Sequence, residues 1–362
     1  MDVAKLWNKI FDTIKASPRV LPSTIEIPRD HTDETLATFN ESFKRDKHYF
    51  QVLINEMYLV NQREWFKKID PVVYVVSEFT YNGKDQIVPK LVGPSLLKDE
   101  GVPDEYNKGV IIRNTAVSGL FPYRGGGLTL TVVLCESKTD DYARKLLRVV
   151  ESTAQALDFS PVLTPYTKIA GAVMDGFEML FSSGSITPLA GLRDSYGPNL
   201  NTAFRPTYFA QIDSANVDPA TLWVRGKQLM QGKSLDASKP YRAGDFVLYS
   251  IIGPQDNARD DLETLPFNEL WVKVKKGAAS PIDKPNYEAT KRDMSTLYEM
   301  IVASPDLTED HGYAIADEYA GRMKTIHEKA VKLGAMDGDK TSAQERESVA
   351  ALHKKSLALL RT

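Results

Sequence analysis

The chain has 362 residues, of which 42% are apolar and 26% charged, and this ordinary globular composition excludes a disordered or collagen-like protein. Its 45 Lys and Arg against 48 Asp and Glu give a net charge of −3, which offers no global field to attract nucleic acid or an anionic membrane. Cys135 is the single cysteine, so no intramolecular disulfide forms. Without a secretory signal pattern or an apolar run of membrane-spanning length, we expect a cytoplasmic protein.

The first helix is expected at residues 2–15, where apolar residues from Val3 to Ile14 recur at spacings of three and four. It should end at Ser17-Pro18. Because its charges are mixed, its apolar face is expected to pack on this chain or on a second copy, with docking to a membrane surface as the alternative.

A second helical region is expected at residues 33–66. Apolar residues between Leu36 and Tyr58 recur at helical spacing, which predicts one broken helix or two consecutive helices. Together with the first helix, this region would form a helical N-terminal arm over residues 1–70.

Residues 71–280 are predicted to form a central, mainly antiparallel β-sandwich. The period changes at Pro71 to a β-branched and aromatic run, and Asn82-Gly83 is a strong hairpin signal. A helical hairpin over residues 140–182 should interrupt the strands and cover the sheet, with Gly171 and Gly176 marking a close helix contact. The strands are expected at residues 72–79, 110–113, 128–135, 208–212, 222–224 and 246–252.

Residues 281–362 contain no strand signal and are predicted to form a helical C-terminal segment. Its helices are expected around residues 287–301, 313–333 and 349–360, after a short helix at 267–274. The fold class is therefore α+β, with a helical arm, a sandwich core and a helical segment along the chain.

Several motifs resemble catalytic or metal-binding signatures but fail on spacing. Gly226 to Ser234 resembles a phosphate loop, yet five residues separate its glycines instead of four. His327-Glu328 lacks the second histidine of a zinc-protease helix, and the calcium-loop pattern that begins at Asp337 lacks its Gly and Glu. Cys135 lies in an apolar strand, where a thiol is usually inert. We therefore predict no catalytic residue, no metal ligand and no cofactor.

The first candidate binding feature is the sequence Pro122-Tyr123-Arg124-Gly125-Gly126-Gly127, which runs directly into an apolar strand. Three glycines permit positive φ and close backbone approach, so their amides could form an anion-binding nest beside Arg124. The alternative is a tight turn or bulge at a sheet edge.

The second candidate is a set of arginines and aspartates in the predicted loops and strand ends of residues 186–262, where binding residues are often mounted. If the loops gather, their carboxylates could bind a divalent cation or perform acid–base chemistry. The alternative is that each arginine pairs with a neighbouring aspartate to fix a turn. The residues are Arg193, Asp194, Asp213, Asp218, Arg242, Asp245, Arg259, Asp260 and Asp261.

These observations favour a non-catalytic interaction or scaffold protein that binds a protein partner, or a second copy, through β-domain loops and terminal helices. The alternative from another class is a metal- or anion-dependent hydrolase with an Asp/Arg site on loops. A third hypothesis is peripheral membrane attachment through residues 2–15. No motif is specific enough to name a family.

Overall fold

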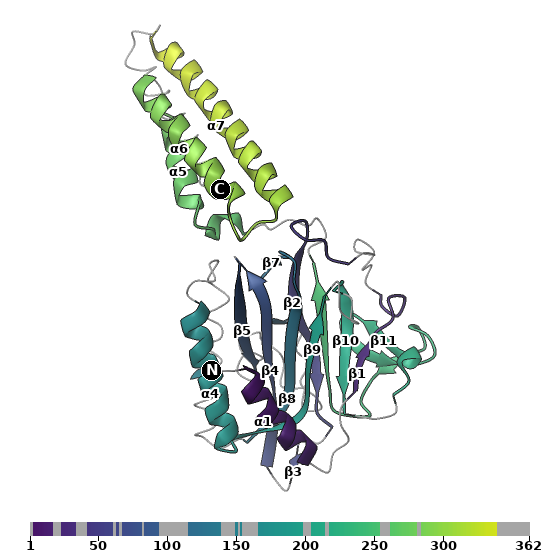
Figure 1. The fold of residues 1–362 in the computed structure, drawn as a ribbon. Coiled ribbons are helices and arrows are strands. Elements are labelled where there is room, and N and C mark those ends of the chain that lie inside the picture. Colours follow the sequence, from purple (N-terminus) through teal and green to yellow (C-terminus); the bar gives the residue numbers. More distant parts are fainter. Residues whose placement is uncertain are drawn as a thin grey trace. The chain divides into compact units, whose positions relative to one another are not determined.

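The structure is a computed structural model of the chain, and it forms two compact units, Met1–Asp260 and Asp261–Thr362 (Figure 1). The structure describes residues 3–16, 23–33, 42–60, 63–64, 67–81, 83–93, 115–138, 149–150, 153, 166–197, 204–213, 217–253, 261–280 and 284–338.

Two antiparallel sheets form the centre of the first unit. One has the strand order β1-β10-β14-β2-β6, with β7 also paired to β2, and the other has the order β3-β4-β8-β9, with β5 paired to β4. The strands of the first sheet are β1 (Ser23–Glu26), β2 (Tyr49–Tyr58), β6 (Thr115–Ala116), β7 (Phe121–Pro122), β10 (Thr207–Ile212) and β14 (Phe246–Ile252). Those of the second are β3 (Arg63–Glu64), β4 (Lys67–Tyr81), β5 (Lys84–Val92), β8 (Leu128–Lys138) and β9 (Ile186–Tyr196).

The two sheets face each other across one hydrophobic core. Alternate residues of β4 and β8, such as Val75 and Val132, lie in the same buried cluster as Val247 and Tyr249 of β14. This alternation places one side of β4, β8 and β14 in the core, which is the basis of a sandwich. The expected α+β fold with a central antiparallel sandwich is confirmed, as is the Asn82-Gly83 hairpin, since Tyr81 pairs directly with Lys84.

The helices α1 (Val3–Ala16) and α4 (Tyr166–Ser182) cover the outer face of the β4-β5-β8-β9 sheet (Figure 1). Gly191 of β9 admits α1 closely, because an added Cβ would lie 3.0 Å from both Ile14 Cδ1 and Trp7 Cζ3. The apolar face of α1 is thus buried on its own chain, as the first interpretation of residues 2–15 expected. It is not left exposed for a membrane or a second copy.

Of the expected helical hairpin over residues 140–182, the second helix is present as α4. Residues 140–157 lie largely outside the described residues, but Val150 is buried and would overlap a Cβ added at Gly176. The close helix contact inferred from Gly176 is therefore present. Gly171 has open space instead. The strand expected at residues 110–113 also lies outside the described residues.

A third, smaller sheet covers the outer face of β1, β10 and β14 with its own buried cluster. It consists of β11 (Leu222–Arg225), β12 (Gln228–Gln231) and β13 (Lys239–Pro240), preceded by the short 3-10 helix η3 (Pro219–Thr221). The segment that resembled a phosphate loop forms its hairpin, with positive φ at Gly226 and Lys227. Residues 31–33 extend this sheet, because Thr32 forms a parallel bridge with Val224.

The helices predicted over residues 33–66 are wrong for β2, which is a ten-residue strand. Phe50, Val52 and Ile54 point into the sandwich core, and a bulge at Asn55 moves the inward positions to Met57 and Leu59. The bulge breaks the two-residue period, so the apolar spacing imitates a helix.

The second unit is helical and begins before the expected boundary at residue 281. Its helices are η4 (Leu262–Thr264), α5 (Asn268–Ala278), α6 (Lys284–Val302) and α7 (Glu309–Gly338), and they enclose their own apolar core. The helix α5 belongs to this unit because Gly277 lets it approach α6 so closely that an added Cβ would overlap Thr290 Oγ1. The helix expected at residues 349–360 lies outside the described residues.

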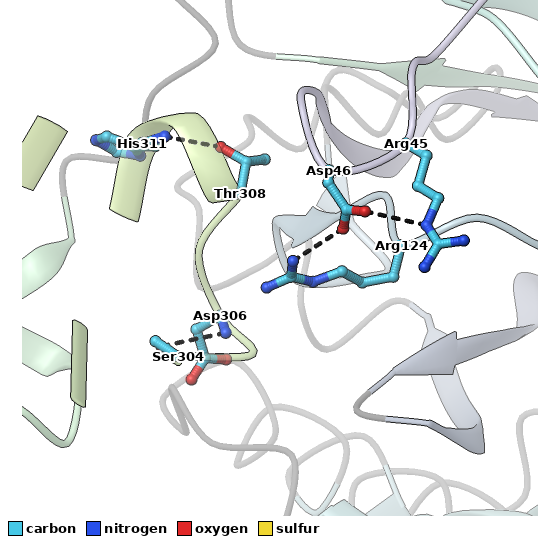
Figure 2. A network of polar contacts seen from close by, with 7 residues as sticks. All are labelled: Arg45, Asp46, Arg124, Ser304, Asp306, Thr308 and His311. Carbon is cyan, nitrogen blue, oxygen red and sulfur yellow. Dashed lines mark hydrogen bonds and ion pairs between the residues drawn. The ribbon is translucent and has the colours of Figure 1, made fainter. Parts of the chain in front are cut away.

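The start of α7 is fixed by a short polar turn. Thr308 Oγ1 accepts a hydrogen bond from the His311 N–H, and the Asp306 N–H donates to Ser304 Oγ (Figure 2). Thr308 is thereby the N-terminal cap of the helix.

Candidate functional site

Two turns of the first unit are hydrogen-bonded to each other, and we call them the basic turns: residues 44–48, which precede β2, and residues 123–127, which link β7 to β8. The Asp46 N–H donates to the Tyr123 carbonyl (2.7 Å), and the Tyr123 N–H donates to the His48 carbonyl (2.8 Å). Since β7 pairs with β2 while β8 belongs to the opposite sheet, the second turn carries the chain across the sandwich.

Asp46 lies between two arginines, one from each turn (Figure 2). Its Oδ1 accepts from Arg124 Nη1 at 2.9 Å, and its Oδ2 accepts from Arg45 Nε at 3.0 Å. Its backbone is left-handed (φ 59°), a conformation that Asp tolerates better than most residues. One carboxylate therefore bridges two guanidinium groups.

The glycines predicted as an anion nest shape the second turn. Gly125 and Gly126 have φ of 89° and 80°, and Gly127 leads directly into β8. A Cβ at Gly125 would lie 3.1 Å from Arg45 Cδ, so the glycine lets the aliphatic part of Arg45 pack against the turn. The conformation is fixed by the Tyr123 hydroxyl, which donates to the Gly126 carbonyl at 2.9 Å. Burial raises the pKa of Tyr123, which keeps this donor protonated, although Arg45 partly opposes the shift.

Tyr123 of the basic turns packs in a cluster of aromatic rings. Tyr123 packs edge-on against Phe204 with ring centres 5.0 Å apart, and Phe43 packs against the same ring at 4.7 Å. Such pairs add about 0.5–1.5 kcal/mol each beyond area burial. These ring contacts hold the basic turns in a fixed position. Further rings of this cluster are Phe50, Phe79 and Phe121.

The basic turns concentrate positive charge on a chain whose net charge is −3. Among their own residues, the basic turns include four basic side chains, Lys44, Arg45, Lys47 and Arg124, and one carboxylate, Asp46. The first three are exposed, and Arg45 has 73% of its side chain accessible. The arrangement therefore suits the binding of an anionic group.

Sequence reasoning found only half of this site. It identified Arg124 and its three glycines, but placed residues 44–48 inside a predicted helix. The signal that could have found them is the run Lys44-Arg45-Asp46-Lys47-His48, the densest group of basic residues near a strand start in this region.

The predicted pair Arg193 and Asp194 is separated by its position in β9. Arg193 Nη1 bonds Glu78 of β4 and lies 3.0 Å from Thr131 Oγ1 of β8, whereas Asp194 accepts from the Ser195 N–H at 2.8 Å. Successive strand residues point to opposite faces, which is why neighbours in sequence do not pair here.

The predicted pair Arg242 and Asp245 is also not formed. Arg242 Nη2 bonds Glu56 at 2.9 Å, and Asp245 Oδ1 accepts from the Val60 N–H at 2.7 Å. Glu56 is completely buried and also accepts from the Leu229 N–H at 2.7 Å, so it joins β2 to the small sheet.

The other predicted site residues either have local structural roles or lie outside the described residues. Asp213 is joined to Asp245 through the main chain, by an N–H to carbonyl bond of 2.8 Å, and Asp218 caps η3 by accepting from the Ala220 N–H. Asp261 precedes η4, and Arg259 and Asp260 lie outside the described residues. In the part of the chain that the structure describes, no three His, Cys, Asp or Glu side chains are grouped to bind a metal ion.

Within the same described ranges, no helix combines the length and apolar character that crossing a bilayer requires. Comparison of the chain with protein-family models, curated proteins and solved structures found no match.

Proposed function

We propose that this protein is a non-catalytic interaction protein of the cytoplasm. It binds a protein partner through loops of its first unit, Met1–Asp260, which we call the β unit, with the basic turns as the principal contact. The observation that supports this proposal is the concentration of four basic side chains on two rigid, mutually bonded turns. An acidic surface group of a partner would be attracted to them and would meet donors already held in place, which reduces the entropy lost on binding.

The sequence also suggested that terminal helices bind the partner. Because α1 is buried on its own sheet, this part of the proposal now concerns only the helices of the second unit. Among the described residues, α5, α6 and α7 carry exposed large apolar side chains that could add to a partner contact. These are Val272, Met300, Tyr313 and Val331.

The test is a charge reversal on the full chain in its native cell. Arg45→Glu with Lys47→Glu changes the charge of the basic turns by four, and Lys233→Glu with Lys239→Glu makes the same change on the small sheet as a matched control. Proteins bound to each version are cross-linked, purified and quantified by mass spectrometry, after circular dichroism has shown that both variants are folded.

We expect stoichiometric partners to be lost from the first variant and retained by the second, because rim charges act on association through complementary potentials. Identical partner sets for both variants and the unaltered chain would contradict the proposal.

A further inference from the structure

The free edge of β9 is a second surface of the β unit that can receive another chain. We propose that an extended segment of a protein partner, in which basic and apolar residues alternate, adds to β9 as a further strand of its sheet. The inference goes beyond the proposed function, because none of the residues involved belongs to the basic turns.

The first argument is that β9 has main-chain groups open to pairing. It pairs with β8 on one side only, and the Ser195 N–H points away from β8, because it donates to the Asp194 carboxylate of its own strand. Main-chain groups alternate in direction along an antiparallel strand, so those of Gly191 and Arg193 also point to the open side. Among the described residues, no main-chain hydrogen bond reaches them there. Such an edge is a template for pairing with another chain.

The second argument is that the sandwich is one strand short beside β9. The Tyr196 ring packs against Phe209 of β10 with ring centres 5.2 Å apart, so β9 lies across from β10. The other sheet continues past β10 to β1, whereas β9 is the last described strand on its own side. Glu26 of β1 pairs with Phe209 and shares its inward face, yet Glu26 is exposed. A strand added to β9 would lie across from β1 and cover this place.

The third argument concerns the length of the open edge. At one end Pro188 has no N–H, and a bulge beside it interrupts the ladder with β8. At the other end the Ser195 N–H is already bonded to Asp194. The open stretch is therefore residues 189–193. It suits a short extended segment better than the whole β9 strand of a second copy.

The two faces of this edge favour different side chains. On the inward face, Asp194 bonds no Lys or Arg side chain of the described residues. On the outward face, Gly191 lies against Trp7, which stacks on Phe11 at 5.4 Å, and both rings are partly exposed. Successive residues of an added strand point to opposite faces, so a Lys or Arg beside Asp194 would alternate with an apolar residue beside the rings. Main-chain bonds supply affinity in this mode of binding, and the alternate side chains supply specificity.

The experiment measures, by fluorescence anisotropy, the binding of a fluorescein-labelled heptapeptide of alternating lysine and valine to the full chain. Two further peptides carry methyl groups on the main-chain nitrogens of either the lysines or the valines. Only one of these sets can face β9. We therefore expect one methylated peptide to bind roughly tenfold more weakly and the other to bind like the parent, since the first loses its donors to the edge. A peptide with glutamate in place of lysine should bind more weakly than the parent.

Variants of the chain test the same contacts from the other side. Arg193→Pro removes the outward N–H, and Arg193→Met is its matched control, because both lose the bond to Glu78 but only the proline lacks the N–H. We expect Arg193→Pro to bind the parent peptide roughly tenfold more weakly than Arg193→Met does. Asp194→Asn, which keeps an acceptor for the Ser195 N–H, should weaken binding, whereas Asp317→Asn on α7 should leave it unchanged. Circular dichroism checks that each variant is folded.

The proposal would be overturned if the parent peptide does not bind, or if both methylated peptides bind as tightly as it does. Equal binding by Arg193→Pro and Arg193→Met would have the same meaning, as would a glutamate peptide that binds as tightly as the lysine peptide. A mass of two chains in light scattering that Arg193→Pro reduces to one would also overturn it, because a second copy would then occupy the edge. None of these outcomes depends on the charge reversal in the basic turns.

Discussion

Gln211 is a fully polar side chain in the apolar interior of the sandwich. It is 1% exposed, and within the described residues neither its amide nitrogen nor its amide oxygen has a hydrogen-bond partner. Leaving such a group unsatisfied costs about 1–3 kcal/mol, so we expect Gln211→Met to raise the free energy of unfolding by about that amount. Urea unfolding measures the change. Gln51→Met is the control, because the Gln51 amide donates to the Ser118 carbonyl and its removal should give no gain. A less stable Gln211→Met would show that the amide is satisfied in solution.

Three buried tyrosines make the β unit sensitive to alkali. Burial raises the pKa of Tyr74, Tyr196 and Tyr249 above the ordinary value of 10.0. Above pH 10 the unfolded chain therefore binds fewer protons than the native chain, and the free energy of unfolding decreases as pH rises. Below pH 10 the stabilising contribution of these tyrosines to the free energy of unfolding is fully present. Urea midpoints between pH 8 and 11 should fall less steeply for Tyr74→Phe than for the unaltered chain, with the exposed Tyr313→Phe as control; equal slopes would count against this assignment.

At the scale of elements, the two glycines of α4 provide a matched pair. Gly171 has open space, so Gly171→Ala should raise the free energy of unfolding by about 1 kcal/mol through helix propensity. A Cβ at Gly176 would overlap Val150, so Gly176→Ala should lower it despite the same gain in propensity. Thermal unfolding distinguishes the two, and an equal stabilisation by both would mean that Val150 moves away freely.

Glu56 of β2 is bonded both to the Leu229 N–H of the small sheet and to Arg242, which lies between β13 and β14. Because Glu56 is fully buried, Arg242→Met would leave a buried charge and should cost about 3–5 kcal/mol. Glu56→Gln combined with Arg242→Met should recover most of that loss. Lys291→Met, which breaks an exposed pair with Glu288, is expected to have little effect on stability. Chemical unfolding measures all three, and a small effect of Arg242→Met alone would contradict the role of the pair.

Sequence periodicity predicted helices and strands correctly where one period persists along a segment, as in α1, α4, β8 and β14. It failed at β2 because the bulge at Asn55 combines two strand phases into a helical spacing. That error also hid the turn containing Asp46. The partners of Arg193 and Arg242 could not be predicted, because Glu78 and Glu56 lie on strands far away in sequence and only the sheet order brings them near.

At the scale of the whole molecule, each unit has its own hydrophobic core, and we expect each to respond separately to a cavity. Leu130 of β8 and Leu297 of α6 are both fully buried, in different cores. A Leu→Ala substitution at such a site costs about 2–5 kcal/mol. Hydrogen exchange on the full chain should show faster exchange only in residues 1–260 for Leu130→Ala and only in residues 261–362 for Leu297→Ala. Faster exchange throughout the chain in either variant would show that the two cores unfold together.

The burial of α1 against β9 has a consequence for biosynthesis. Ile14 and Trp7 meet Gly191, which the ribosome adds much later. At usual elongation rates of about 5–20 residues per second, β9 is synthesised roughly 10 to 35 s after α1, whose apolar face packs on it. During that interval the nascent chain carries an amphipathic segment whose apolar side lacks the strand that buries it in the folded protein.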